Sequence, residues 1–183
     1  MHHTLSDYIV DLVQNSVEAH STLVMVDLLE QDGSIKVCIA DNGSGMDEET
    51  LARIKDPFFT GGGKHEKRKV GLGISFLAQL MTQCGGTWEI SSEKEMGTSL
   101  FFKYASSNPD VPPMGNLVSA VVCCLGMQGD YDLKFNRVYG NNSYSVMRSE
   151  LFGAIGDLYD AQSLIAVRTY LRTLEKDLLE KGI

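Results

Sequence analysis

The first twenty residues alternate apolar and polar positions with the period of an amphipathic helix. Between residues 5 and 20 the apolar side chains recur three and four positions apart, at Leu5, Tyr8, Ile9, Leu12, Val13 and Val17. Thr4 and Asp7 supply a start signal for this helix. Two β-rich runs follow, separated by the turn Gln31-Asp32-Gly33, over residues 23–29 and 34–40. The pattern therefore predicts a helix and then a β-hairpin.

A second group of helices and strands follows the hairpin. Residues 47–55 predict a short helix that Asp47 caps and that ends before Pro57. The next stretch, 60–73, is rich in glycine and basic residues and has no period, so it predicts a loop. A helical pattern returns over 74–84, and a second hairpin is predicted over residues 87–92 and 98–104.

The segment 105–115 marks a boundary in the chain. It holds three of the four prolines among small polar residues, which is typical of a linker. After it the sequence is strongly apolar over 116–125, alternates over 130–147 and is helical over 162–181. We therefore divide the chain into a first domain, 1–104, the linker, and a C-terminal appendage of unknown role, 116–183. We expect residues 116–147 to supply strands that complete the sheet or form a small satellite layer.

Composition narrows the class of protein. With 183 residues, of which 43% are hydrophobic and 22% charged, the chain suits one packed domain with a small appendage. A net charge of −8 repels polyanions, so we expect neither a nucleic acid nor an anionic membrane as partner. No apolar run has the length of a membrane span, and the N-terminus does not read as a signal peptide, so we expect a cytoplasmic protein.

Two polar patterns suggest a binding site. Asp11 and Asn15 stand four residues apart, so one face of the first helix presents a carboxylate and an amide together. Alone, this pair is as well explained by an ordinary polar helix flank. The second pattern is the turn after the predicted strand 34–40, where Asp41 precedes Gly43 and Gly45 and where glycine permits a ligand to approach the backbone closely.

Two further elements follow in order. Gly71-Leu72-Gly73 precedes the predicted helix 74–84, and a helix start after glycines offers free backbone N–H groups to phosphate. Alone this pattern is weak, because many turns share it. Gly97-Thr98 at the start of the last predicted strand is uninformative by itself.

Taken together over residues 4–104, these elements resemble the GHKL ATPases. That superfamily includes gyrase-type topoisomerases, the ninety-kilodalton heat-shock chaperone, sensor histidine kinases and MutL mismatch-repair proteins. The segment Asp11–Ala19 is similar to the first motif of MutL, whereas Asp56–Gly73 looks like a histidine kinase. The chain also resembles small free-standing bacterial ATP-binding proteins that begin almost directly at this helix.

The resemblance implies a fold, an α+β two-layer sandwich of Bergerat type, in which helices cover a mixed, mainly antiparallel sheet. It also implies ATP and Mg²⁺ as cofactors. Asn15 would ligate magnesium, Asp41 would accept a hydrogen bond from the adenine amino group, and Thr98 would reach the base directly or through water. The remaining cofactor-binding residues would be the pocket-wall glycines, the phosphate-binding loop and one lid lysine, namely Gly43, Gly45, Gly71, Gly73 and Lys64. Met46 and Leu72 could stack on adenine, although ordinary core packing explains them as well.

Asp11 is the candidate catalytic residue and departs from the hydrolytic members of the superfamily, which carry Glu there. Aspartate is one methylene shorter, so it would act as a base through a longer reach or a second water. Alternatively, it would hold magnesium-bound water.

Three activities remain open from the sequence. The first is a protein kinase in signalling or regulation that phosphorylates a partner protein, since His20 and His65 are poorly placed as acceptors. The second is an ATP-driven conformational switch, and the third is a regulatory subunit that binds nucleotide without hydrolysing it. A homodimer through the C-terminal appendage is also possible on this reading.

Overall fold

The computed structural model describes residues 4–55, 72–156 and 159–181. Along the chain its elements are α1 (Leu5–Glu18), β1 (Leu23–Gln31), β2 (Ser34–Asp41), α2 (Glu48–Lys55), α3 (Leu72–Gln83), β3 (Thr87–Glu93), β4 (Gly97–Ala105), α4 (Leu117–Leu125), β5 (Asp132–Tyr139), β6 (Asn142–Met147), α5 (Arg148–Ile155) and α6 (Ala161–Lys181). Both predicted hairpins and the predicted helices are present, with ends that differ by one or two residues.

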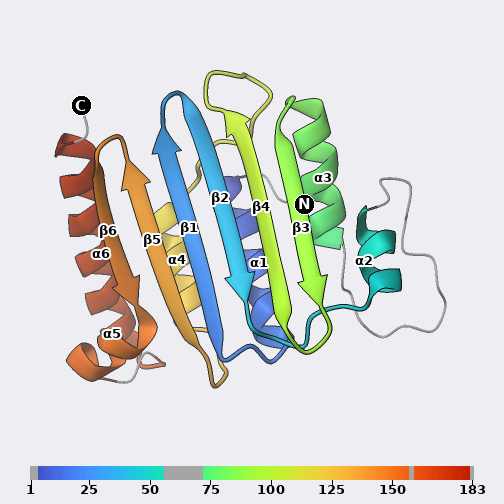
Figure 1. Cartoon of the computed structure of the whole chain (residues 1–183). Coiled ribbons are helices and arrows are strands. Elements are labelled where there is room, and N and C mark those ends of the chain that lie inside the picture. The colour runs from blue at the N-terminus through green and yellow to red at the C-terminus, as the bar shows by residue number, and fades with distance from the viewer. Residues whose placement is uncertain (1–3, 56–71, 157–158, 182–183) are drawn as a thin grey trace.

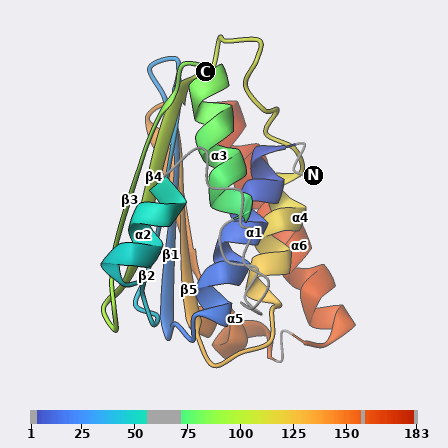
Figure 2. The same cartoon turned by 90° about the vertical axis from the view of Figure 1, so that its right-hand side faces the viewer.

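The strands form one twisted sheet in the order β3-β4-β2-β1-β5-β6 (Figure 1). Every neighbouring pair is antiparallel except β1 and β5, which run parallel over eight residue pairs. The long helices lie on one face of this sheet (Figure 2). The predicted fold class, an α+β two-layer sandwich with a mixed and mainly antiparallel sheet, is confirmed.

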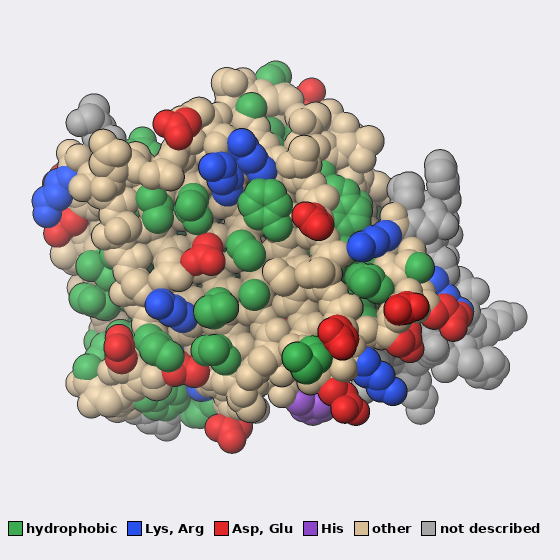
Figure 3. All heavy atoms as spheres, viewed as in Figure 1, with side chains coloured by type: hydrophobic (Ala, Val, Ile, Leu, Met, Phe, Trp, Pro, Cys, Tyr) green, Lys and Arg blue, Asp and Glu red, His purple; other side chains and the backbone are tan. Residues whose placement is uncertain are grey.

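No helix of the described residues lies on the other face of the sheet (Figure 2). In the space-filling view of this face, apolar side chains are interspersed with acidic and basic ones (Figure 3). The alternation of each strand explains this mixture, since successive side chains point to opposite faces and only one face meets the helices. We therefore expect the functional side chains predicted from the sequence to lie on the helix-covered face.

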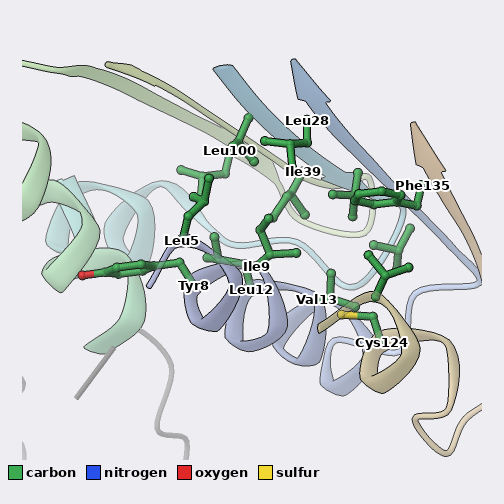
Figure 4. Packing of buried hydrophobic residues seen from close by; sticks show 14 of the residues in the cluster. Leu5, Tyr8, Ile9, Leu12, Val13, Leu28, Ile39, Leu100, Cys124 and Phe135 are labelled. Carbon is green, nitrogen blue, oxygen red and sulfur yellow. The ribbon is translucent and has the colours of Figure 1, made fainter. Parts of the chain in front are cut away.

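Helix α1 forms for the reasons that its sequence suggests. Thr4 is its N-cap, and a capping box is complete because Thr4 Oγ1 accepts from the Asp7 N–H while Asp7 Oδ2 accepts from the Thr4 N–H. Its apolar stripe, including Leu5, Ile9 and Leu12, is buried. These side chains point toward Leu28, Ile39 and Leu100 of the sheet (Figure 4).

Residues after the predicted linker share this core. Strands β5 and β6 complete the sheet. This is the first of the two arrangements expected for residues 116–147, the other being a small satellite layer. Phe135 of β5 and Cys124 of α4 belong to the same buried cluster as Val13 of α1 (Figure 4). The apolar run 116–125 is helix α4, which packs against α1. The division of the chain into two domains and a linker stays a prediction, although the hydrophobic core is continuous across it.

Candidate functional site

Asp41 and Thr98 lie opposite each other at one end of the sheet. Asp41 is the last residue of β2, Thr98 is the second residue of β4, and the antiparallel register pairs them directly. Both side chains point to the helix-covered face, because each follows the alternation set by a buried neighbour two residues away, Ile39 and Leu100. The fold therefore brings together two predicted site residues that are 57 positions apart.

The Asp41 carboxylate is held in place by two hydrogen bonds. The Ser16 hydroxyl donates to Oδ2 at 2.7 Å, and the Gly43 backbone N–H donates to Oδ1 at 2.9 Å. A carboxylate oxygen can accept more than one hydrogen bond, so both oxygens keep capacity for a further donor. The bond from Ser16 ties β2 directly to α1.

Ser16 is a site residue that the sequence reasoning missed. It is 4% exposed, and its position four residues after Leu12 places it on the buried stripe of α1 rather than on the polar flank. A buried serine needs a hydrogen-bond partner, and this one has Asp41 together with the Leu12 carbonyl at 3.3 Å. In the sequence, Ser16 could have been identified as a polar residue that interrupts the apolar stripe of the helix directly after Asn15.

Asn15 and Asp11 are half-buried on α1, four residues apart, as the spacing predicts. Among the residues that the structure describes, none forms a hydrogen bond with the Asn15 carboxamide. Within the described residues its oxygen therefore keeps its capacity as a hard ligand atom, and Asn15 directly precedes Ser16, which contacts Asp41. The structure does not test the metal-binding role of Asn15 or the catalytic role of Asp11, which stay predictions.

The glycines of this end of the sheet permit close backbone packing. Gly45 has φ +57°, and a Cβ there would lie 1.9 Å from the Glu93 carbonyl oxygen. A Cβ on Gly97, φ +110°, would lie 1.9 Å from the Asp41 carbonyl oxygen. Gly43 meets the end of α1 in the same way, with the Ala19 carbonyl oxygen 2.8 Å from its would-be Cβ. These contacts explain the glycines structurally, and the ligand contacts predicted for Gly43 and Gly45 remain predictions.

A small hydrogen-bond network fixes the Thr98 hydroxyl. Ser92 Oγ accepts from the Met46 N–H at 2.9 Å and donates to the Gly97 carbonyl at 2.9 Å. Ser92 has one proton, so the 2.8 Å contact between Ser92 and Thr98 requires Thr98 to be the donor. The Thr98 oxygen is then left as an acceptor. The Met46 side chain packs partly buried against the core, and its predicted contact with adenine is untested.

Helix α3 begins beside α1 on the same face of the sheet (Figure 2). Gly73 is buried in its first turn, where the backbone N–H groups of a helix have no intrahelical partner. Leu72 is the first residue of α3, and its predicted contact with adenine stays a prediction. Lys64 and Gly71 lie outside the described residues, so the predicted phosphate contacts of this loop rest on the sequence.

A second cluster of polar groups, around Arg148, lies in the C-terminal part of the chain. Arg148 is 6% exposed, and its Nε donates to the Leu125 carbonyl at 2.9 Å while an Nη donates to the Tyr159 hydroxyl at 3.0 Å. Its guanidinium lies 4.2 Å from the Tyr131 ring centroid and 4.8 Å from that of Phe152. Burial raises the pKa of Tyr131 to about 12, with the Arg148 charge opposing that rise.

Arg137 is the other buried cation of this part. It is 2% exposed, pairs with Glu30 at 2.8 Å and lies 3.5 Å from the Glu175 carboxylate. Glu175 also accepts a 2.6 Å hydrogen bond from the Tyr144 hydroxyl. Burial, reinforced by that bond, raises the Tyr144 pKa. These groups join the last helix to strands β1, β5 and β6, and the buried Arg137 Nε forms no hydrogen bond with a described residue.

None of the helices in the described ranges combines the length and the apolar character that crossing a bilayer requires.

Comparison with known proteins places the candidate site in a family context. The sequence profile of the histidine kinase-, DNA gyrase B- and HSP90-like ATPases matches residues 3–107. A sensor protein of Shewanella frigidimarina is 31% identical over 109 residues, which are 58% of this chain and 16% of that protein. Sporulation kinase A of Bacillus subtilis is 29% identical over 97 residues, 52% of this chain and 15% of the kinase. The match thus spans about a sixth of the length of these relatives.

Two solved structures are also similar. The catalytic domain of histidine kinase ThkA is 23% identical, with a TM-score of 0.41 and coverage of 55% of this chain and 64% of that one. The Aquifex aeolicus MutL ATPase domain complexed with ADP is 15% identical, with a TM-score of 0.45 and coverage of 75% and 61%.

Proposed function

The chain belongs to the family of histidine kinase-, DNA gyrase B- and HSP90-like ATPases, and from this premise we propose that it binds Mg-ATP and phosphorylates a partner protein. The observation that carries the nucleotide site is the Asp41 carboxylate, held by Ser16 and Gly43 and opposite Thr98, with Asn15 immediately before Ser16 on α1. A fixed acceptor, together with an amide oxygen that no described residue bonds, suits one ligand that has both a donor group and a metal-bound phosphate chain.

Each group has a role that its chemistry supports. Asp41 accepts a hydrogen bond from the exocyclic amino group of adenine, which guanine cannot offer at that position. The Thr98 oxygen, whose proton goes to Ser92, serves as an acceptor for the same amino group or for a bridging water. Asn15 supplies its amide oxygen to magnesium, which commonly takes few protein ligands and completes its shell with phosphate oxygens and waters.

The phosphoryl-transfer step is proposed on the family relationship and on the names of the relatives, which include a sporulation kinase and sensor kinases. Magnesium neutralises charge on the transferring phosphoryl group when it is bound. Asp11, one turn before Asn15 on the same helix, orients the acceptor hydroxyl or imidazole, or a magnesium-bound water. The acceptor is proposed to lie on a partner protein; His20, the one histidine among the described residues, follows the end of α1 at φ +59° rather than lying on a helix.

An ATP-driven switch is the second candidate, and one observation favours it. Helix α1, which carries Asp11 and Asn15, packs on α4, and β1 pairs along its length with β5. A movement of α1 on nucleotide binding would therefore reach the C-terminal part directly.

One labelling experiment separates these candidates. The protein is incubated with ATP labelled at the γ-phosphate and magnesium, with and without cell extract, and label is followed on proteins and as free phosphate. Label transferred to a protein supports the kinase, provided that Asn15→Ala abolishes it. Free phosphate without labelled protein supports the switch. If neither labelled protein nor free phosphate appears, both candidates are contradicted and a non-hydrolysing binder is left.

A further inference from the structure

The start of α1 is capped by a segment far away in the sequence. The first N–H groups of a helix have no partner within the helix. In α1 the Leu5 N–H donates to the Pro113 carbonyl at 2.9 Å, and the Ser6 N–H donates to the Met114 carbonyl at 3.0 Å. The Ser6 hydroxyl donates to the same Met114 carbonyl at 2.6 Å. Residues 113 and 114 thus satisfy three donors of the first helical turn.

The next residue fits closely against the helix cap. Gly115 has φ +76°, and a Cβ there would lie 2.5 Å from Thr4 Oγ1 and 2.6 Å from Thr4 Cβ. Only glycine allows the chain to pass this close to the N-cap while it adopts this conformation. Asn116 then caps α4, because its Oδ1 accepts from the Ser119 N–H at 3.0 Å. One short segment therefore fixes the N-termini of two helices that pack together.

The segment is stiff where it contacts α1. Two consecutive prolines, Pro112 and Pro113, have a fixed φ and restrict the residue before each of them.

The far end of α1 is also in contact with the C-terminal part. A Cβ on Gly129 would lie 3.2 Å from the Val17 side chain and 3.2 Å from the Tyr131 ring. Both ends of α1 are thus held by residues beyond position 107, where the family match ends.

We infer that residues 113–115 position α1 and thereby set the nucleotide affinity of the site at its other end. The inference rests on the proposed function, because α1 carries Asn15 and Asp11. An α-helix rises 1.5 Å per residue, so Asn15 lies about 15 Å from Leu5 along one rigid element. A displacement at the cap therefore moves the amide oxygen relative to Asp41, which is fixed on the sheet. The coupling is reciprocal, so bound nucleotide also stabilises the cap.

Two alanine variants test the inference as a matched pair. Gly115→Ala and Gly33→Ala make the same change at φ +76° and φ +66°, but a Cβ on Gly33 has no atom within 4 Å. Both variants should lose stability from backbone strain. Gly115→Ala alone should raise the Kd for ADP with magnesium, by about fivefold or more, whereas Gly33→Ala should stay within about twofold. Equal Kd values in the two variants would overturn the inference.

A second readout does not depend on nucleotide. Amide hydrogen exchange of Leu5 and Ser6 should be slow in the parent and in Gly33→Ala but fast in Gly115→Ala. Fast exchange of these two amides in the parent would show that the hydrogen bonds of the cap are not stably formed. If the parent binds no ADP, the proposed function fails, while slow exchange at these amides would still support the cap itself. If Gly115→Ala does not fold, Ser6→Ala replaces it, since it removes the hydrogen bond from the Ser6 hydroxyl to the Met114 carbonyl without adding an atom and leaves the backbone bond in place.

Discussion

Two polar clusters at the same end of the sheet, around Asp41 and around Arg148, use their side chains in opposite ways. At the end of β2, Asp41 is oriented by two donors and keeps accepting capacity, and the side chain of Asn15, the residue before Ser16, forms no hydrogen bond with a described residue. Around Arg148, by contrast, backbone carbonyls and aromatic rings surround a buried cation. Polar groups that are fixed but not fully used suit a ligand, whereas polar groups bound within the protein hold the fold together. The predictions below test this difference, beginning with the largest effect.

Arg148→Ala should cause the largest change, and it should change stability. Removing the guanidinium leaves the Leu125 carbonyl without its donor and opens a space between Tyr131 and Phe152. We expect a loss of about 3 kcal/mol in the free energy of unfolding, measured by urea denaturation. Arg53→Ala is the control, because Arg53 is exposed and pairs with Glu49 four residues earlier, an interaction worth about 0.5 kcal/mol. Equal losses in both variants would contradict a structural role for Arg148.

Asp41→Asn should change binding more than stability. The variant replaces an acceptor oxygen with a donor, so it should weaken ATP binding by about 2 kcal/mol and reduce the preference for ATP over GTP. Calorimetric titration with both nucleotides measures this. Asp27→Asn is the matched control, since Asp27 lies on the helix-free face and bonds to Asn136. Retained selectivity in Asp41→Asn would contradict the adenine contact.

Ser16→Ala should have a smaller effect on both properties. It removes the 2.7 Å hydrogen bond to Asp41 without removing the carboxylate, so we expect about 1 kcal/mol less stability and a few-fold weaker ATP binding. Ser21→Ala removes another 2.7 Å hydrogen bond, from Ser21 Oγ to the Ser16 carbonyl, and should lower stability alone. Thermal unfolding with and without ATP measures both quantities. Identical ATP affinities in the two variants would show that Ser16 does not orient Asp41 for binding.

The local parts of the fold were predictable because their causes are local. The apolar stripe and capping box of α1 and the turn between β1 and β2 each lie within a few residues of sequence. The turn after Asp41 was recognisable as a candidate site for the same reason. What connects α1 to Asp41, the Ser16 hydroxyl, joins residues 25 positions apart and had only a weak signal, a polar residue on an apolar stripe.

The non-local parts could not be predicted in the same way. The parallel pairing of β1 with β5 joins residues about a hundred positions apart, and no pattern within either strand specifies the partner. The run 116–125 is too uniformly apolar to show a period, so its helical state was not predicted. The short helix α5 was also not predicted. Arg148 begins this helix, and no pattern in the sequence indicates that its guanidinium is buried.

The central claim is that α1 and the ends of β2 and β4 form one site for an adenine nucleotide and its metal. Calorimetric titration of the parent protein and of Asn15→Ala with ATP, each in magnesium and in EDTA, tests it most directly. The account predicts that the parent binds ATP more tightly with magnesium and that Asn15→Ala loses this magnesium dependence. No heat of binding in the parent, or an unchanged magnesium dependence in Asn15→Ala, would contradict it.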